Sequence, residues 1–244
     1  MKRIYADLHL CPNLDNEKQT AHMIRKAAAL GYRLIAIPVP LSLTEKKVRW
    51  LRNLCEETGI EFASRIDLKP RTPRELIVNL RRLRRKFEII AVLCETKQVA
   101  RQAAKDRRVD LLNFPAINFR RRFFDKAEAE LASSGLTAFE IDVKPLIMFE
   151  GAARVRLMSN LRKEVAIAQK FRVPTIVSSG VSDELHMRKP RELAALASLF
   201  DLKETAALEA VSKNPVAIVK RNREKLSPRF VAPGIRVIRR GKDC

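Results

Sequence analysis

The sequence predicts an α/β protein, a single TIM-barrel-like (β/α) domain of about seven parallel strands with outer helices. Short apolar or β-branched runs alternate with segments of helical periodicity along most of the chain. Repeated strand, helix, strand units build a parallel sheet. The length of 244 residues also matches the ~250 residues of a single (β/α) barrel.

Seven runs are predicted to be strands because Gly, Pro or polar residues bound each of them. They span residues 4–10, 34–38, 61–68, 88–94, 111–116, 138–143 and 175–181. The last run contains Ser178, Ser179 and Gly180, and a cationic linker then leads to an Ala/Leu-rich helix that begins at Pro190. This segment holds one complete strand, loop and helix, which is the unit that repeats along the chain.

Helix start signals lie between the predicted strands. Ser42 and Glu45 fit a capping box, in which two side chains satisfy free amides at a helix start. Thr72, Pro73 and Glu75 supply a cap, a first-turn proline and a box glutamate together. These signals place helices after the second and third predicted strands, as a barrel requires.

The domain organisation is predicted to be simple, since no internal linker divides the chain. We expect one barrel domain over residues 1–226 and a basic C-terminal tail over residues 227–244, with a possible short strand at 235–238. Residues 193–222 indicate two or three short helices and no obvious eighth strand. Closure by seven or by eight strands is left open.

Basic residues far outnumber acidic residues in the sequence. The 49 Lys and Arg against 28 Asp and Glu give a net charge of +21, with a pI near 10.4. Such an excess favours a polyanionic partner, nucleic acid ahead of an anionic membrane surface. No apolar run approaches the ~20 residues of a membrane span, and no signal peptide opens the chain, so we expect a cytoplasmic protein with no membrane partner. Four scattered cysteines exclude a common zinc site.

The predicted strand-to-helix loops concentrate cations at one end of the barrel. Arginine forks bind phosphate, and the aromatic residues of the loop 118–124, NFRRRFF, can either stack on unpaired bases or anchor the loop. Ser178 and Ser179 can either donate to an anion or simply pack in a tight turn. The predicted RNA-binding residues are Lys69, Arg71, Lys97, Arg120, Arg121, Arg122, Lys144, Ser178, Ser179, Arg188, Lys189 and Arg191.

A second group of cations lies on predicted outer helices. Charge runs of this kind are usually solvated faces, but neighbouring helices could merge them into a track for an RNA backbone. The group comprises Arg81, Arg82, Arg84, Arg85, Lys86, Arg101, Lys105, Arg107 and Arg108.

A metal-dependent phosphoesterase is the alternative hypothesis, with Asp7, His9, Glu95 and Asp183 as ligands at predicted strand ends. The chain has only three histidines, and Cys11 stands where a D-L-H-x-H motif would place its second His. Because a multinuclear site needs several imidazoles, the sequence predicts no bound metal. A scaffold that binds only protein is a third hypothesis, which the charge disfavours.

Four motifs carry a resemblance to a known family. They are D-L-H at 7–9, I-V-S-S-G at 176–180, K-P-R-E-L-A-A-L-A at 189–197 and S-K-N-P-V-A-I-V-K-R-N at 212–222. Over about residues 4–225 the chain resembles archaeal ribonuclease P protein component 3, the counterpart of the eukaryotic 30-kilodalton subunit. It departs from the pattern at Lys189, where a capping Ser is common, and in its basic tail.

The resemblance implies a barrel related to the PHP metallo-phosphoesterases but without their metal ligands. It implies a noncatalytic subunit of the ribonucleoprotein that removes the 5′ leader of precursor tRNA, in which the RNA performs cleavage with Mg²⁺. The implied partners are the catalytic RNA, other RNase P proteins and a small ferredoxin-like subunit, with which the family forms a dimer of heterodimers.

Overall fold

The computed structural model describes residues 3–118, 121–232 and 235–238. Within these ranges a seven-stranded sheet has the order β1-β2-β3-β4-β5-β6-β7, and every pairing is parallel. The predicted fold class is confirmed, and each of the seven predicted runs contains one strand, although the first strand is shorter than the predicted run at 4–10. The strands are β1 (Ala6–Asp7), β2 (Leu34–Pro38), β3 (Glu61–Leu68), β4 (Ile89–Leu93), β5 (Leu111–Asn113), β6 (Ala138–Asp142) and β7 (Thr175–Ser178).

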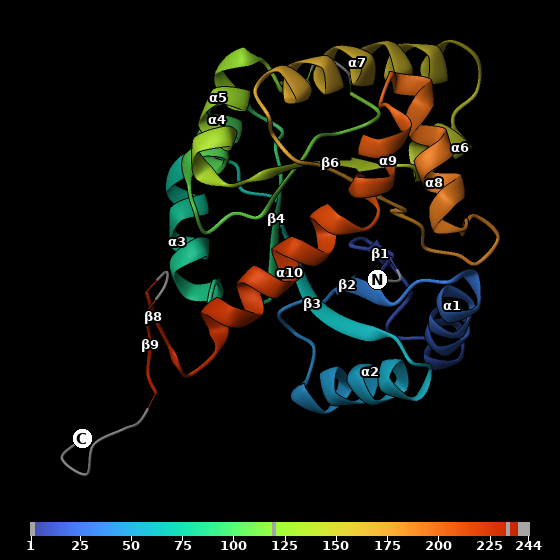
Figure 1. The fold of residues 1–244 in the computed structure, drawn as a ribbon, viewed down its shortest axis with the longest axis vertical. Helices are drawn as coiled ribbons and strands as arrows, with labels where there is room; N and C mark the ends of the chain where they lie inside the picture. Colours follow the sequence, from blue (N-terminus) through green and yellow to red (C-terminus); the bar gives the residue numbers. More distant parts are fainter. Residues whose placement is uncertain (1–2, 119–120, 233–234, 239–244) are drawn as a thin grey trace.

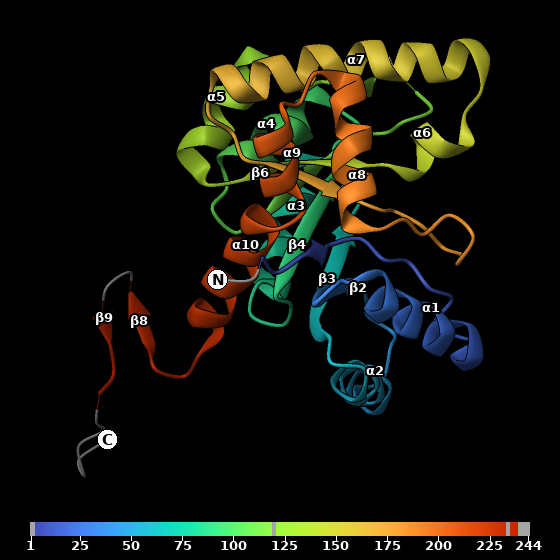
Figure 2. The ribbon, with the colours of Figure 1, turned by 45° about the vertical axis from the view of Figure 1, so that its right-hand side comes forward.

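The sheet curls into a nearly closed barrel (Figures 1 and 2). Backbone hydrogen bonds just beyond the ends of β1 and β7 bridge the remaining gap. The Gly180 amide donates to the His9 carbonyl across 2.9 Å, and the Cys11 amide donates to the Val181 carbonyl across 2.9 Å. The loops that follow the first and last strands therefore meet at the carboxyl end of the barrel.

Helices cover the outer face of the barrel, and α10 runs across its amino-terminal end (Figure 1). Among the described residues, none of the helices is long and apolar enough to cross a membrane. The helices are α1 (Glu17–Leu30), α2 (Glu45–Glu57), α3 (Pro73–Leu83), α4 (Lys97–Lys105), α5 (Lys126–Gly135), α6 (Lys144–Met148), α7 (Gly151–Lys170), α8 (Pro190–Ala197), α9 (Glu204–Ala210) and α10 (Lys213–Leu226), with a short 3₁₀ turn at Ser198–Phe200.

One of the two predicted helix caps is confirmed and one is wrong. The Thr72 hydroxyl accepts a hydrogen bond from the Glu75 amide, as predicted for α3. In α2 the cap is Thr44, which accepts from the Lys47 amide, and not Ser42. Ser42 lies inside a turn closed by a bond between residues 43 and 40, so it is too far from the helix start to cap it.

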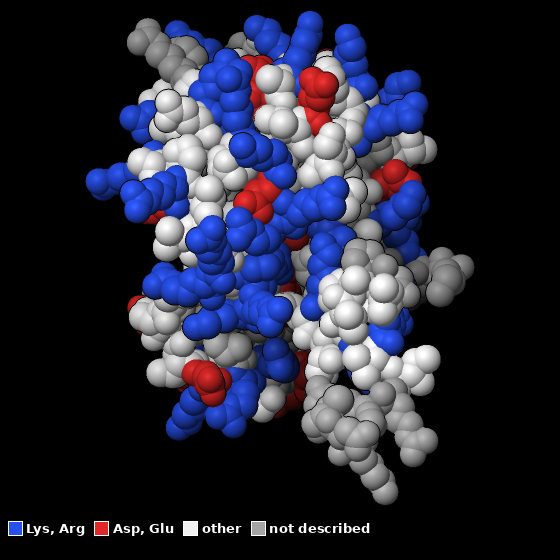
Figure 3. Space-filling view, turned by 90° about the vertical axis from the view of Figure 1, so that its left-hand side faces the viewer, with Lys and Arg blue, Asp and Glu red and all other residues white. Residues whose placement is uncertain are grey.

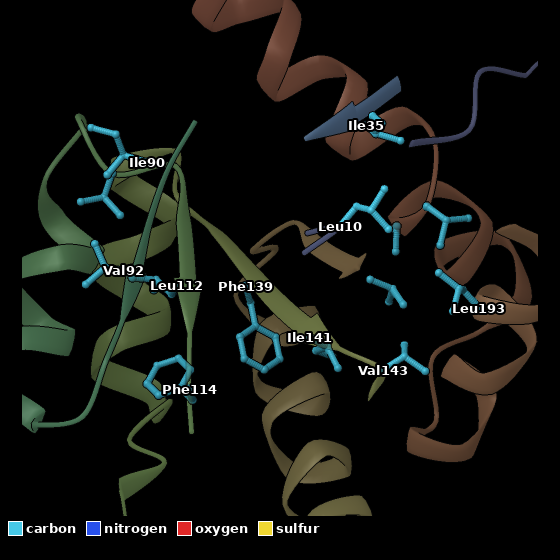
Figure 4. Close-up of a cluster of buried hydrophobic side chains, with 14 of the residues drawn as sticks. Leu10, Ile35, Ile90, Val92, Leu112, Phe114, Phe139, Ile141, Val143 and Leu193 are labelled. Carbon is cyan, nitrogen blue, oxygen red and sulfur yellow. The ribbon is translucent and has the colours of Figure 1, made fainter. Parts of the chain in front are cut away.

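The core has two parts on opposite faces of the sheet. The outer part lies between strands and helices and includes Val92, Leu112 and Phe139 (Figure 4). The inner part fills the amino-terminal end of the barrel with alanine, leucine and isoleucine side chains, against which Ile218 and Val219 of α10 pack. Apolar residues thus seal one end of the barrel and leave polar residues to fill the other.

An antiparallel hairpin follows α10. Its strands are β8 (Phe230–Ala232) and β9 (Ile235–Arg236), so the short strand predicted at 235–238 is present over two residues. The hairpin extends away from the barrel beside the end of α10 (Figures 1 and 2). An ion pair between Arg236 and Glu224 connects it to that helix.

Candidate functional site

Arg65 lies at the centre of the polar end of the barrel. Its side chain is 1% exposed. The two terminal nitrogens bind both oxygens of Glu140 at 2.6 and 2.7 Å, and Nε binds Asp67 at 2.7 Å. The Leu8 carbonyl accepts a further bond at 2.6 Å. A bidentate arginine pair of this geometry gives a buried carboxylate a fixed positive partner.

His9 and Asn113 extend the hydrogen-bond network around Arg65. Both ring nitrogens of His9 bind carboxylates, Nδ1 to Asp142 at 2.8 Å and Nε2 to Asp67 at 3.1 Å. The Asn113 amide nitrogen donates to Asp142 at 2.9 Å and to Glu140 at 3.1 Å. Strand residues point inward at every second position, so β3 and β6 each contribute two members to this barrel-end network.

The carboxylates keep His9 protonated at neutral pH. Burial and the charge of Arg65 both favour the neutral imidazole, but the attraction of Asp142 and the hydrogen bonds to Asp142 and Asp67 outweigh them. They raise the pKa of His9 well above its ordinary value. Although burial opposes it, the nearby cations lower the pKa values of Asp67 and Asp142. The network therefore contains two cations among three carboxylates.

These shifts predict a stability maximum in mildly acidic solution. The raised pKa of His9 adds stability that is complete below about pH 6.5 and is lost as pH rises toward the folded-state pKa. The lowered pKa values of Asp67 and Asp142 add stability that is present above about pH 4 and is lost on acidification. Denaturant unfolding at a series of pH values should show the His9→Asn variant losing less stability than wild type between about pH 6.5 and 9. If the free energy of unfolding changed equally with pH in the two proteins over this range, the raised pKa of His9 would be contradicted.

The described residues contain one cluster with metal-ligand potential. One donor atom each from His9, Glu140 and Asp142 lies within 4.8 Å of the others. The Arg65 guanidinium already supplies positive charge to Glu140, and both nitrogens of the imidazole bind carboxylates. A metal would have to displace these bonds, so the donor set fits a salt-bridge network better than a metal centre.

The four ligands of the phosphoesterase hypothesis are not brought together. Asp7 is buried and accepts the amides of His9 and of the loop after β7. Glu95 pairs with a loop arginine, and Asp183 binds the ring of His186 at 2.6 Å. Only His9 of the four belongs to the barrel-end cluster.

The predicted RNA-binding cations follow successive strands, so they share the carboxyl end of the barrel. Lys144 and Arg188 are partly exposed, and Arg120 lies outside the described residues. Contact between these side chains and RNA stays a prediction. The exposed members are Lys69, Arg71, Lys97, Arg121, Lys189 and Arg191.

Three predicted RNA-binding residues do not face solvent. Arg122 binds both oxygens of Glu164 at 2.8 and 2.5 Å, and its side chain is 5% exposed. Ser178 donates to Glu140 at 2.8 Å, and Ser179 donates to the His9 carbonyl at 3.3 Å. Each of these groups satisfies a partner within the protein, and contact of any of them with RNA stays a prediction.

The described aromatic residues of the loop after β5 support the alternative in which they anchor the loop. Phe124 is buried, and its ring stacks on Phe139 with centroids 4.5 Å apart. It anchors the loop to the barrel. Phe119 lies outside the described residues.

Sequence reasoning missed Arg65 and Asn113 altogether. The available signal was the alternation within the strand at 61–68, where an arginine and Asp67 occupy inward positions two residues apart. A buried arginine needs carboxylate partners, and Glu140 and Asp142 show the same spacing on another strand.

The comparisons with known proteins agree with one another. The model of a family described as RNase P subunit p30 matches residues 4–227. Ribonuclease P protein component 3 of Methanosarcina barkeri is 31% identical over 234 residues, which cover 96% of this chain and 95% of that protein. The corresponding protein of Halorubrum lacusprofundi is 25% identical and is covered to 97%.

Solved structures share the fold. A chain in a cryo-EM structure of archaeal ribonuclease P with mature tRNA superposes with a TM-score of 0.85 at 19% identity, covering 97% of this chain and 99% of that one. A putative prolidase from Bifidobacterium longum has a TM-score of 0.56 at 13% identity over 91% of this chain and 70% of its own. The match of the family model and the archaeal relatives together show that this chain belongs to the RNase P subunit p30 family and is a protein subunit of ribonuclease P.

Proposed function

We propose that this subunit binds and supports the catalytic RNA and takes no part in the chemistry of cleavage. The observation that carries the proposal is the position of Arg65, which neutralises Glu140 and Asp67 at the end of the barrel where (β/α) barrels place their reactive groups. For the same reason we propose that the chain binds no metal of its own and that Mg²⁺ serves the RNA. Its precursor tRNA substrate would be that of the whole ribonucleoprotein.

The proposed partners follow from the family and the charge. The similar archaeal chain was solved within ribonuclease P bound to mature tRNA, and the net charge of +21 suits an RNA partner. We also propose pairing with a small ferredoxin-like subunit, in a dimer of heterodimers, alongside other RNase P proteins in the cytoplasm.

Cleavage by reconstituted ribonuclease P tests the noncatalytic role. His9→Gln should cleave precursor tRNA within about threefold of wild type at a temperature where both proteins are folded. Loss of a general acid or base would cost about 100-fold or more. Such a loss with a folded subunit, or stoichiometric metal in protein purified without chelator and released by the same substitution, would favour the phosphoesterase hypothesis.

The loop after β5 offers a contrast between exposed and buried arginines. The sequence alone predicted that replacing Arg120, Arg121 and Arg122 by Ala would flatten the dependence of log affinity on log salt by about two to three units. With Arg122 paired to Glu164, the change should be at most about 1.8, from the other two. Arg122→Ala alone should leave the slope unchanged and lower the melting temperature. An unchanged slope in Arg120→Ala/Arg121→Ala would remove this loop from the RNA footprint.

A further inference from the structure

A basic groove lies at the amino-terminal end of the barrel, opposite the cationic loops described above. It has a volume of about 560 Å³ and is formed by the residues that follow α3 and α4, the end of α10 and strand β8. Its lining, within the described part of the chain, contains no carboxylate. The charged lining residues are Arg84, Arg85, Arg107, Arg108 and Lys225.

Two of these five cations serve the fold. Arg84 binds Asp110 and the carbonyls of residues 87, 88 and 108. Arg108 binds both oxygens of Asp106. They hold the α3–β4 and α4–β5 turns in place and so fix the shape of the groove.

The other three cations are available to a ligand. Arg85, Arg107 and Lys225 are exposed, and no described residue forms an ion pair or side-chain hydrogen bond with them. The pKa of Lys225 is lowered by burial and by the charges of Arg221 and the groove arginines, with Asp110 opposing them only in part. An anion that enters the groove would relieve this repulsion.

One wall of the groove is apolar. Phe230 is half-buried and lies with Pro228 and Val231 beside the cations. The volume falls in the range of about 300–1000 Å³ that accommodates a small ligand. A ring next to phosphate-binding groups suits single-stranded RNA, whose bases are free to stack, better than a duplex or an acidic peptide.

The groove is continuous with a wider basic surface. Helices α3 and α4 pack side by side, and Lys and Arg side chains cover much of the face that they form (Figures 1 and 3). The merging of helix cations that the sequence suggested is thus present. RNA leaving the groove would meet further positive charge on this face.

We propose that this groove binds an unpaired nucleotide of RNA, with phosphates at Arg85, Arg107 and Lys225 and the base against Phe230. The proposal rests on the proposed RNA-binding function and adds a site, a ligand class and a mode of recognition. It also gives the hairpin β8–β9 a role, since its first strand supplies the stacking ring.

The test compares full-length variants in binding to a short labelled oligouridylate across a range of salt concentrations. Arg107→Ala/Lys225→Ala removes one arginine and one lysine from the groove. The control variant Arg25→Ala/Lys46→Ala also removes one arginine and one lysine, from α1 and α2 on the other side of the molecule. The groove variant should bind about tenfold more weakly and flatten the salt slope by about 1.4, since single strands contribute about 0.7 per phosphate contact. The affinity of the control variant for the oligouridylate should stay within twofold of that of wild type.

Phe230→Leu provides the second arm. It should weaken oligouridylate binding at least fivefold without changing the salt slope, and it should leave a blunt-ended RNA duplex unaffected. Equal effects of the two double variants, or unchanged affinity in Phe230→Leu, would overturn the groove assignment.

If wild type fails to bind the RNase P RNA or to support precursor tRNA cleavage, the proposed function itself fails. If wild type succeeds while the groove variants match the control, only the groove is rejected.

Discussion

Replacing Arg65 by methionine should lower the free energy of unfolding by about 3–5 kcal/mol. Methionine keeps most of the side-chain volume but leaves Glu140 without its positive partner in a site that is 2% exposed. Asp67 loses its bond to the guanidinium at the same time. Removing one member of a buried ion pair is costly because the remaining charge stays out of water.

Two further variants make this result interpretable. Adding Glu140→Gln to Arg65→Met should recover part of the loss, since it removes the stranded charge, and the pair should therefore be strongly non-additive. Arg74→Met, on the exposed face of α3, should stay within about 0.5 kcal/mol of wild type. Urea unfolding measures all three. A cost at Arg65 no larger than at Arg74 would show that the network does not hold the barrel end together.

Replacing Asp110 by alanine should cost about 2–4 kcal/mol. Asp110 is 1% exposed and lies just before β5. It accepts bonds from Arg84 at 2.5 Å, Arg221 at 3.1 Å, Asn222 at 2.8 Å and the Ile90 amide at 2.9 Å. The cost should be smaller than at Arg65 because both arginines can reach water.

The destabilisation caused by Asp110→Ala should be concentrated in α10. Arg221 and Asn222 belong to that helix, so loss of Asp110 releases it from the end of the barrel that it seals. Amide hydrogen exchange in α10 should rise more than exchange in β3 or β4. Asp15→Ala, at an exposed position, should change neither stability nor exchange. Uniform exchange changes across the barrel would contradict a local clamp.

The order of strands and helices was predictable because it depends on local pattern and on the regular repeat of the βαβ unit. The partners of side chains across the barrel were not. Arg65 meets Glu140 only after the four strands from β3 to β6 have curled around a common axis, and the alternation within its own strand does not say which carboxylate it meets. Asp7 and His9 were recognised at a strand end, but their contacts come from distant segments.

The sequence also does not tell which cations of the loops are exposed and which are buried. The loop after β5 contains three consecutive arginines, which local sequence does not distinguish. Arg122 is nevertheless held by Glu164 from α7, while Arg121 is exposed. Which cation turns inward depends on a helix about 40 residues later that places one carboxylate against the loop. Charge patterning predicts that a surface is basic, and packing decides which side chains remain free.

Residue-resolved cross-linking of the intact subunit to RNase P RNA tests most directly whether the basic surfaces bind RNA. We expect cross-links at the exposed loop cations, including Lys69, Arg121 and Lys189, and in the groove beside Phe230. Cross-links confined to α1 and α2, or none under conditions where precursor tRNA is cleaved, would contradict an RNA-binding role for these basic surfaces.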